Sequence, residues 1–230
     1  MPWFQNRDKA GEGAMQVLAL SVARPVEIEY GSRKISTGFY KSAVEGPRMV
    51  RETNIDGDQQ ADLTVHGGPH KAVYAFPAEH YEFYQNQLGQ SGYAFGHFGE
   101  NLTTEGMLET EVRIGDRYQI GEALLEVSQP RSPCFKFGIR MGVREAIKTC
   151  LASARTGFYF RVISEGSVEA GDAIELAHRD NGAPSVTAVH NLYYHEKLNE
   201  ESLVQAVGCQ ALAPGFKDEF IERLKILQAK

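Results

Sequence analysis

The sequence predicts a mainly β fold, a β-barrel with a few interspersed helices, followed by a small C-terminal unit of three helices. Short apolar or alternating runs separated by glycine-rich turns fill residues 15–180, as in "EVRIGDRYQIGEALLEVSQP". Many short strands at this spacing are typical of a barrel or a sandwich. A barrel is favoured because closure leaves no exposed strand edge. After "HRDNGAPS" the pattern becomes helical.

The first residues, 1–14, are expected to form a flexible leader. Their sequence, "MPWFQNRDKAGEGA", lacks the apolar centre of a signal peptide. Regular structure is expected from Met15, with the barrel domain at 15–180 and the three-helix unit at 185–230.

Two helices are expected within the barrel domain. "PAEHYEFYQNQLG" begins with Pro77 at a plausible first helical position and ends at Gly89, a typical C-terminal cap. "VREAIKTCLASA" places apolar residues on one helical face, namely Val143, Ile147, Cys150 and Leu151. Cys150 is therefore predicted to be a small core residue.

Three amphipathic segments follow: "SVTAVHNLYYHEKL", "NEESLVQAVGC" and "APGFKDEFIERLKILQ". Ser185 and Asn199 are plausible N-caps, and Pro214 lies near the start of the third helix. A unit of this size is too small to be expected to fold alone. It is predicted to dock on the barrel.

Composition excludes some classes of protein. The net charge of −6 over 230 residues argues against a general nucleic-acid binder. No apolar run approaches the roughly 18 residues of a membrane span. The three cysteines show neither a CxxC motif nor zinc-site spacing. A protein of the reducing cytoplasm is therefore predicted.

Cys134 is the first candidate for chemistry. It lies in "VSQPRSPCFKFGIRMG", near the cationic side chains of Arg131 and Lys136. Such neighbours favour a thiolate, which reacts or binds a metal, and two prolines restrict the backbone around it. The alternative is a half-buried cysteine at a strand end, and composition alone favours that alternative.

Three other motifs are weaker candidates. In "TVHGGPHKAVYAF", His66 and Lys71 flank two glycines whose backbone could bind an anion, or the motif is simply a tight turn. In "HFGENLTTEG", Asn101 and Thr103 could hydrogen-bond a polar heterocycle. Arg161 lies inside the apolar strand "GFYFRVISEG" and needs an internal carboxylate or a ligand phosphate as partner.

Taken in order, "VHGGPHKAV", "FGENL" and "QPRSPC" resemble motifs of the MOSC domain, and the similarity extends over roughly residues 16–227. The chain most resembles the YiiM-type branch, which has the same barrel followed by three helices. The resemblance implies a β-barrel that holds the molybdenum cofactor, a molybdopterin, with Cys134 as the catalytic residue and metal ligand. A soft thiolate suits such a centre.

The resemblance also implies cofactor-binding residues. Ser132 corresponds to the serine two residues before the motif cysteine, and Asn101 to the asparagine of the "F-x-x-N" strand. His66 borders the His-Gly-Gly turn. Cationic candidates for the cofactor phosphate are Lys41, Lys71, Arg131, Lys136 and Arg161. Where other members carry an arginine beside the asparagine, this chain has Gly99 and Glu100, as the YiiM-type branch tends to. It is left open which residue meets the phosphate from that side.

Related proteins reduce N-hydroxylated compounds, such as hydroxylaminopurines and amidoximes, so the resemblance implies an oxidoreductase. The chain shows no flavin, haem or iron–sulfur motif, and a separate reductase protein is therefore expected to supply the electrons. The three-helix unit would dock that reductase or simply cover a barrel face. The oligomeric state is left open, with a homodimer among the options.

Two alternative functions remain open. The chain could be a non-catalytic carrier that binds the cofactor or passes sulfur through a persulfide on Cys134. It could also be a thiol hydrolase that uses Cys134 with His66 as base.

Overall fold

The structure is a computed structural model that describes residues 14–61 and 67–229. The predicted leader lies almost wholly outside these residues, as does His66. The strands are β1 (Gln16–Val22), β2 (Val26–Tyr30), β3 (Arg33–Thr37), β4 (Ser42–Ala43), β5 (Arg48–Arg51), β6 (Asn54–Ile55), β7 (Val73–Pro77), β8 (Leu102–Glu105), β9 (Arg117–Ile120), β10 (Ala123–Pro130), β11 (Phe158–Ser164), β12 (Gly166–Val168) and β13 (Ile174–His178). The helices are α1 (His80–Leu88), α2 (Phe135–Met141), α3 (Ala146–Ser153), α4 (Val186–Tyr194), α5 (Glu200–Gly208) and α6 (Pro214–Gln228), with a short 3-10 helix η3 (Pro69–Lys71).

Eight strands form the main sheet, in the order β13-β9-β10-β11-β7-β8-β1-β4. Neighbours are antiparallel except β7 and β8, which are parallel. A three-stranded sheet, β12-β5-β6, and the hairpin β2–β3 complete the β-structure. The fold is thus a mixed one dominated by sheets, with six α-helices in the described part of the chain.

The predicted closed barrel is not found among the described residues, because no ladder joins the two ends of the main sheet. The ends nevertheless approach each other. Gln16 of β1 forms an isolated bridge with Ala173, just before β13. The Val17 amide also donates to the Asp172 carbonyl at 2.9 Å. Single bonds of this kind cover part of the sheet edge without the continuous register that a closed barrel requires.

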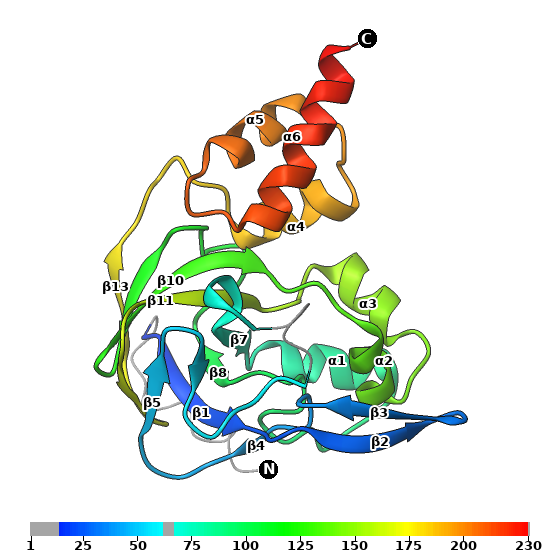
Figure 1. The fold of residues 1–230 in the computed structure, drawn as a ribbon, viewed down its shortest axis with the longest axis vertical. Coiled ribbons are helices and arrows are strands. Elements are labelled where there is room, and N and C mark those ends of the chain that lie inside the picture. The colour runs from blue at the N-terminus through cyan, green and yellow to red at the C-terminus, as the bar shows by residue number, and fades with distance from the viewer. Residues whose placement is uncertain (1–13, 62–66, 230) are drawn as a thin grey trace.

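Helices α4, α5 and α6 lie together at one end of the molecule, against the side of the sheet where β10 and β11 run (Figure 1). Buried residues of these helices, such as Val189 and Phe220, belong to the same apolar core as strand residues such as Leu125. The expected N-caps are confirmed: the side chains of Ser185 and Asn199 each accept a hydrogen bond from a backbone N–H in the first turn. Pro214 occupies the first turn of α6.

A second core, rich in aromatic side chains, joins α1, α2 and α3 to β7. Phe76 and Phe98 are stacked with ring centroids 4.3 Å apart, and Cys150 is buried in this cluster as predicted. The expected start of α1 was wrong: Pro77 pairs with Thr104 as the last residue of β7, and the helix begins at His80. A proline without an N–H can end a strand as readily as it can begin a helix.

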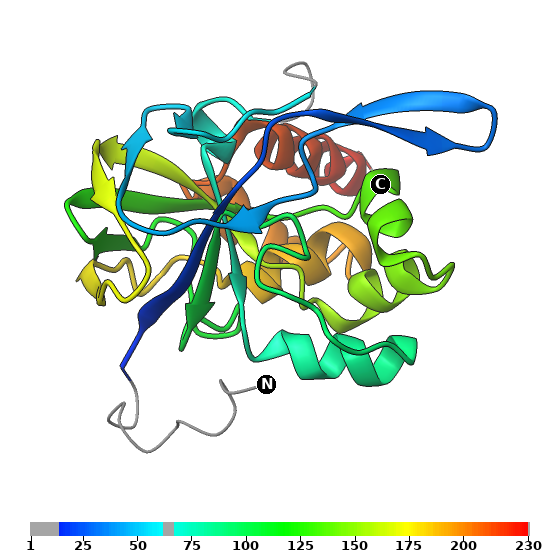
Figure 2. The same ribbon diagram turned by 90° about the horizontal axis from the view of Figure 1, so that it is seen from below.

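The hairpin β2–β3 projects from the body beyond α2 (Figure 2). Its base leads into residues 37–41, which turn back toward the centre of the molecule. Within the described residues, none of the helices combines the length and apolar character that crossing a membrane requires.

Gly157 is where the backbone between α3 and β11 passes closest to β7, and we expect Gly157→Ala to destabilise the protein by at least about 2 kcal/mol. Its φ is +67°, and an added Cβ would lie 2.3 Å from the Ala75 carbonyl oxygen. Gly171→Ala is the control, because φ is +96° there but the space is open. Chemical denaturation of both variants measures the difference; equal losses would show that crowding at Gly157 is unimportant.

Candidate functional site

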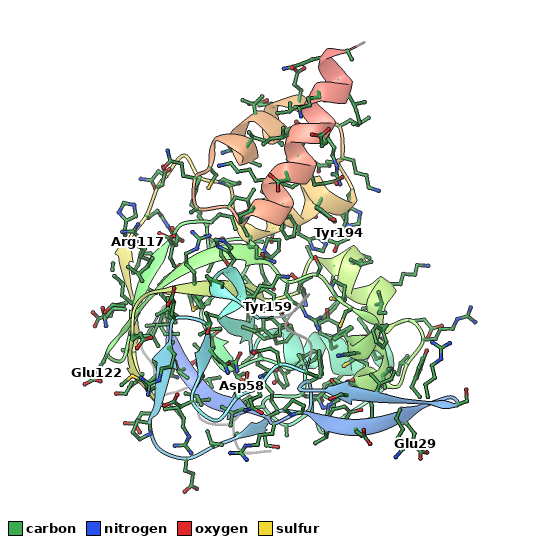
Figure 3. All side chains as sticks on the ribbon, viewed as in Figure 1. Glu29, Asp58, Arg117, Glu122, Tyr159 and Tyr194 are labelled. Atoms are coloured by element: carbon green, nitrogen blue, oxygen red, sulfur yellow. The ribbon has the colours of Figure 1, made fainter. Side chains whose placement is uncertain are left out.

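Nine residues were predicted to bind the cofactor or its metal, and seven of them line one pocket in the described part of the chain: Lys41, Lys71, Asn101, Arg131, Ser132, Cys134 and Lys136. The pocket encloses about 680 Å³ of space when the open solvent at its mouth is included. Its walls come from β7, β11, the residues that follow β10 and the segments 37–41 and 59–61. Figure 3 labels Tyr159 of β11 and Asp58, which lie in the central part of that view.

Cys134 lies at the end of the pocket nearest α2. It is half-buried, its backbone is extended, and it is the N-cap residue of α2, which starts at Phe135. The sequence did not predict this helix, because seven residues with Gly138 at the centre show too little apolar periodicity. The helix and Pro133 together hold the thiol at the pocket wall.

Arg131 is the most buried cation of the pocket, with 4% of its surface exposed. Its guanidinium lies over the rings of Phe39, Tyr74 and Phe137, 4.9 to 5.4 Å from their centroids. Burial opposes its charge, but the surrounding phenol and thiol groups raise the pKa of Arg131 above its ordinary value. Cys134 is among them. No carboxylate among the described residues forms an ion pair with Arg131. A buried cation without such a partner favours an anionic ligand.

Lys41 differs from Arg131 because a buried carboxylate neutralises it. Its Nζ forms an ion pair with Asp58, and burial lowers the pKa of Lys41 although Asp58 opposes that effect. Asp58 also accepts hydrogen bonds from the Ala23 amide at 2.8 Å and from Asn101 Nδ2 at 3.0 Å. Asp58 orders this wall of the pocket, although nothing in the sequence around it predicts that role.

Asn101 is therefore a structural residue of the pocket wall. Its Oδ1 accepts from the Tyr74 amide at 3.1 Å, and its Nδ2 also donates to the Ser21 carbonyl at 3.3 Å. Thr103, suggested as a contact for a heterocycle, is buried and donates to Glu100 at 2.9 Å. The polar groups of both side chains are hydrogen-bonded to other groups of the protein.

Glu100 is fully buried behind this wall. Its Oε1 accepts from Tyr81, Thr103 and the Gly96 amide. Its Oε2 has no hydrogen-bond partner in the part of the chain that the structure describes. Burial raises the pKa of Glu100. A carboxyl with a raised pKa holds its proton more tightly in the folded chain than in the unfolded one.

We therefore expect Glu100→Gln to be more stable than the wild type at pH 8, by on the order of 1 kcal/mol. The wild type loses the stability of the neutral carboxyl as pH rises through its raised pKa, whereas glutamine does not titrate. The advantage should shrink as pH falls toward 4. Thermal unfolding of both chains across this pH range tests the sign, with the exposed Glu175→Gln as control. An advantage independent of pH would contradict the argument.

Lys71, Lys136 and Ser132 are among the more exposed polar residues of the pocket lining. Ser132 is exposed, and Lys71 and Lys136 are half-buried. Burial lowers the pKa of Lys71. Burial raises the pKa of Tyr194 in α4, and a side-chain interaction with Ser132 opposes this rise. Tyr194 is labelled in Figure 3. The three-helix unit thus reaches the rim of the pocket.

Arg161 does not line this pocket, so it is not placed to bind the phosphate of a ligand there, which was one of its two expected roles. Its Nη1 donates to Glu126 at 2.7 Å, the internal carboxylate that the sequence left as the other option. Its Nη2 donates to the Ala211 carbonyl at 2.7 Å and lies 3.0 Å from His70 Nδ1. The physical reason is register: Glu126 and Arg161 are paired residues of β10 and β11.

The glycine turn is placed as expected, whereas its histidine is not described. Gly67 and Gly68 have φ of +77° and +82°, in the region that favours glycine. His66 lies outside the described residues, so a Cys134–His66 pair stays a hypothesis. Within the described residues, no three His, Cys, Asp or Glu side chains gather as a metal site.

Comparison with known proteins identifies both parts of the chain. The family model described as the MOSC domain matches residues 62–175, and the model described as the YiiM-like, 3-alpha helix domain matches residues 184–226. The chain is 39% identical to the uncharacterised protein YflK of Bacillus subtilis, over 90% of this chain and 93% of YflK.

The crystal structure of YiiM from Geobacillus stearothermophilus is similar with a TM-score of 0.78 and 32% identity, over 91% of this chain and 99% of that one. A protein named reductase from Gibberella moniliformis is 37% identical over 64% of this chain. That match spans only 26% of the fungal protein.

Proposed function

The chain belongs to the MOSC domain family, in its YiiM-type branch, and on that premise we propose that it is a molybdenum-cofactor-dependent reductase of N-hydroxylated compounds. The observation that carries the proposal is the buried Arg131 guanidinium beside Cys134, which has no acidic partner among the described residues. An anionic cofactor that also ligates a thiolate would satisfy both groups at once.

The residues of the pocket fit that cofactor. Cys134 would supply a single thiolate, and the pyranopterin would supply the other sulfur ligands, in keeping with the absence of a protein-built metal cluster in the described residues. Arg131, Lys71 and Lys136 would meet the phosphate, because all three line the same pocket. Lys41 is assigned a supporting role since Asp58 already neutralises it.

The reaction we propose converts R–NHOH, two electrons and two protons into R–NH₂ and water. When bound, the cofactor supplies the two-electron redox chemistry that breaking the N–O bond requires. The chain's own residues hold the cofactor, exclude water from the buried side and neutralise its charge. The relative named reductase supports this reaction class. Electrons would come from a separate reductase protein. A cytoplasmic location is part of the proposal, because Cys134 needs a reducing environment to stay a thiol.

The test is to purify the chain from cells that make the cofactor, to measure molybdenum per chain, and to assay hydroxylaminopurine reduction with a chemical electron donor. We expect close to one molybdenum per chain and turnover that depends on it. Absence of both would contradict the proposal. Molybdenum without turnover of hydroxylaminopurine or an amidoxime would favour the carrier alternative instead.

A further inference from the structure

A groove adjoins the candidate cofactor pocket and reaches the three-helix unit. The two share five lining residues, which are Gly67, Lys71, Ser132, Cys134 and Tyr159. Beyond them, the groove is bounded on one side by η3 and the start of α2. On the other side it is bounded by Tyr193 of α4 and by the start of α6, Pro214 to Phe216. Cys134 therefore stands between two spaces, one inside the sheet domain and one between that domain and the helices.

The walls of the groove are aromatic and carry little charge. Their rings belong to Phe135, Tyr159, Tyr193 and Phe216. Phe135 leaves 53% of its surface exposed although it is the residue next to Cys134. Among the described lining residues there is no Asp or Glu, and the charged side chain is that of Lys71. Aromatic rings that line a groove without a carboxylate suit an uncharged planar ring better than a cation.

His70 also lines the groove, and the hydrogen bond on one side of its ring determines which ring nitrogen carries the proton. Arginine only donates, so the contact of 3.0 Å between Arg161 Nη2 and His70 Nδ1 makes Nδ1 the acceptor. Burial and the charge of Arg161 both lower the pKa of His70, which keeps the ring neutral at pH 7 with its proton on Nε2. No described residue is hydrogen-bonded to that Nε2–H.

The groove is held together by contacts between the two parts of the chain. Ser128 Oγ donates to the His70 carbonyl at 2.6 Å, and the Ser128 carbonyl accepts from the Ala213 amide at 3.0 Å. Arg161 joins the same segment through the Ala211 carbonyl. The orientation of His70 and the position of the α6 start are therefore fixed by one network, which is what a preformed binding site needs.

We propose that this groove is the substrate site: it holds an uncharged planar aromatic ring between Phe135 and Tyr193, with His70 Nε2–H donating to a ring acceptor atom. The three-helix unit is then part of the active site, and Arg161 is a positioning residue that acts through His70. The reacting N-hydroxyl group would point toward Cys134. This last step rests on the proposed function, whereas binding of the ring does not.

Isothermal titration with adenine, a neutral planar ring, tests the site on protein purified from cofactor-producing cells. We expect Phe135→Ala and His70→Leu each to weaken adenine binding about tenfold. Both positions are at least partly exposed, so the fold should persist. Ile226→Ala is the matched control. Ile226 is an exposed apolar residue that lies about 15 Å along α6 from Phe216, the last residue of that helix to line the groove. Wild-type affinity in either groove variant, or no adenine binding by the wild type, would overturn the assignment.

Two further readouts separate this proposal from others. Molybdenum content should be the same in both variants as in the wild type. If the protein bound adenine in the groove but contained no molybdenum and showed no turnover, the proposed function would be refuted and the assignment of the groove would remain. Nitrogen NMR of the His70 ring should show the Nε2-protonated tautomer in the wild type and a mixture of tautomers in Arg161→Leu. A ring protonated on Nδ1 in the wild type would overturn the role given to Arg161.

Discussion

Cys134→Ala is expected to lower molybdenum content and hydroxylaminopurine turnover together, each by at least about 100-fold. Loss of residues that merely support a metal ligand already costs 10- to 100-fold, and Cys134 would be the protein's own ligand. The thiol lies at the pocket wall as the N-cap residue of α2 and forms no side-chain cap, so alanine should leave the helix in place. Elemental analysis and a turnover assay on the same preparation measure both effects.

Cys209→Ala is the control for this substitution. Cys209 is also half-buried and outside any disulfide, but it lines neither pocket described above. It should keep the wild-type molybdenum content and rate. If Cys134→Ala retained molybdenum, the metal would be held by other residues and the assignment of Cys134 would be wrong. Retained molybdenum with lost turnover would instead make Cys134 a residue of the reaction alone.

The sequence located this site because its signal is local. Cys134, Ser132, Arg131 and Lys136 fall within six residues, so wherever that segment folds, the four stay near one another. The strands, their glycine turns and the caps at Ser185 and Asn199 were likewise predictable, because each depends on neighbouring residues. The features that the sequence predicted well depend on residues that are close together in the chain.

The features that the sequence did not predict depend on contacts between residues that are far apart in the chain. Asp58 is 17 residues from Lys41 and 43 from Asn101, and nothing in its own surroundings shows that it binds both. The partner of Arg161 follows from the register between β10 and β11. Whether the sheet closes depends on how β1 and β13 meet, and a strand's alternation of polar and apolar residues does not specify its neighbour. The groove is missed for the same reason, since α4 and α6 supply part of it.

The same long-range arrangement gives Arg131 opposite effects on stability and on binding. Without cofactor, Arg131 is a buried cation among aromatic rings with no carboxylate paired to it in the described residues. Replacing even a buried ion pair by apolar side chains of similar volume is often stabilising, by about 1–4 kcal/mol, and an uncompensated buried charge is more costly than a paired one. We therefore expect Arg131→Met to unfold at higher denaturant concentration than the wild type when both lack cofactor.

With cofactor the order should reverse. Arg131→Met should retain at least about tenfold less molybdenum than the wild type, because one charge-assisted contact to the phosphate is lost and the neighbouring thiolate loses its cation. Arg140→Met is the matched control: Arg140 also lies over a tyrosine ring, at 4.5 Å, but it does not line the pocket. A variant that was less stable without cofactor, or that bound cofactor normally, would show that Arg131 serves packing. The expected reversal would mean that the fold accepts a destabilising charge in order to bind an anion.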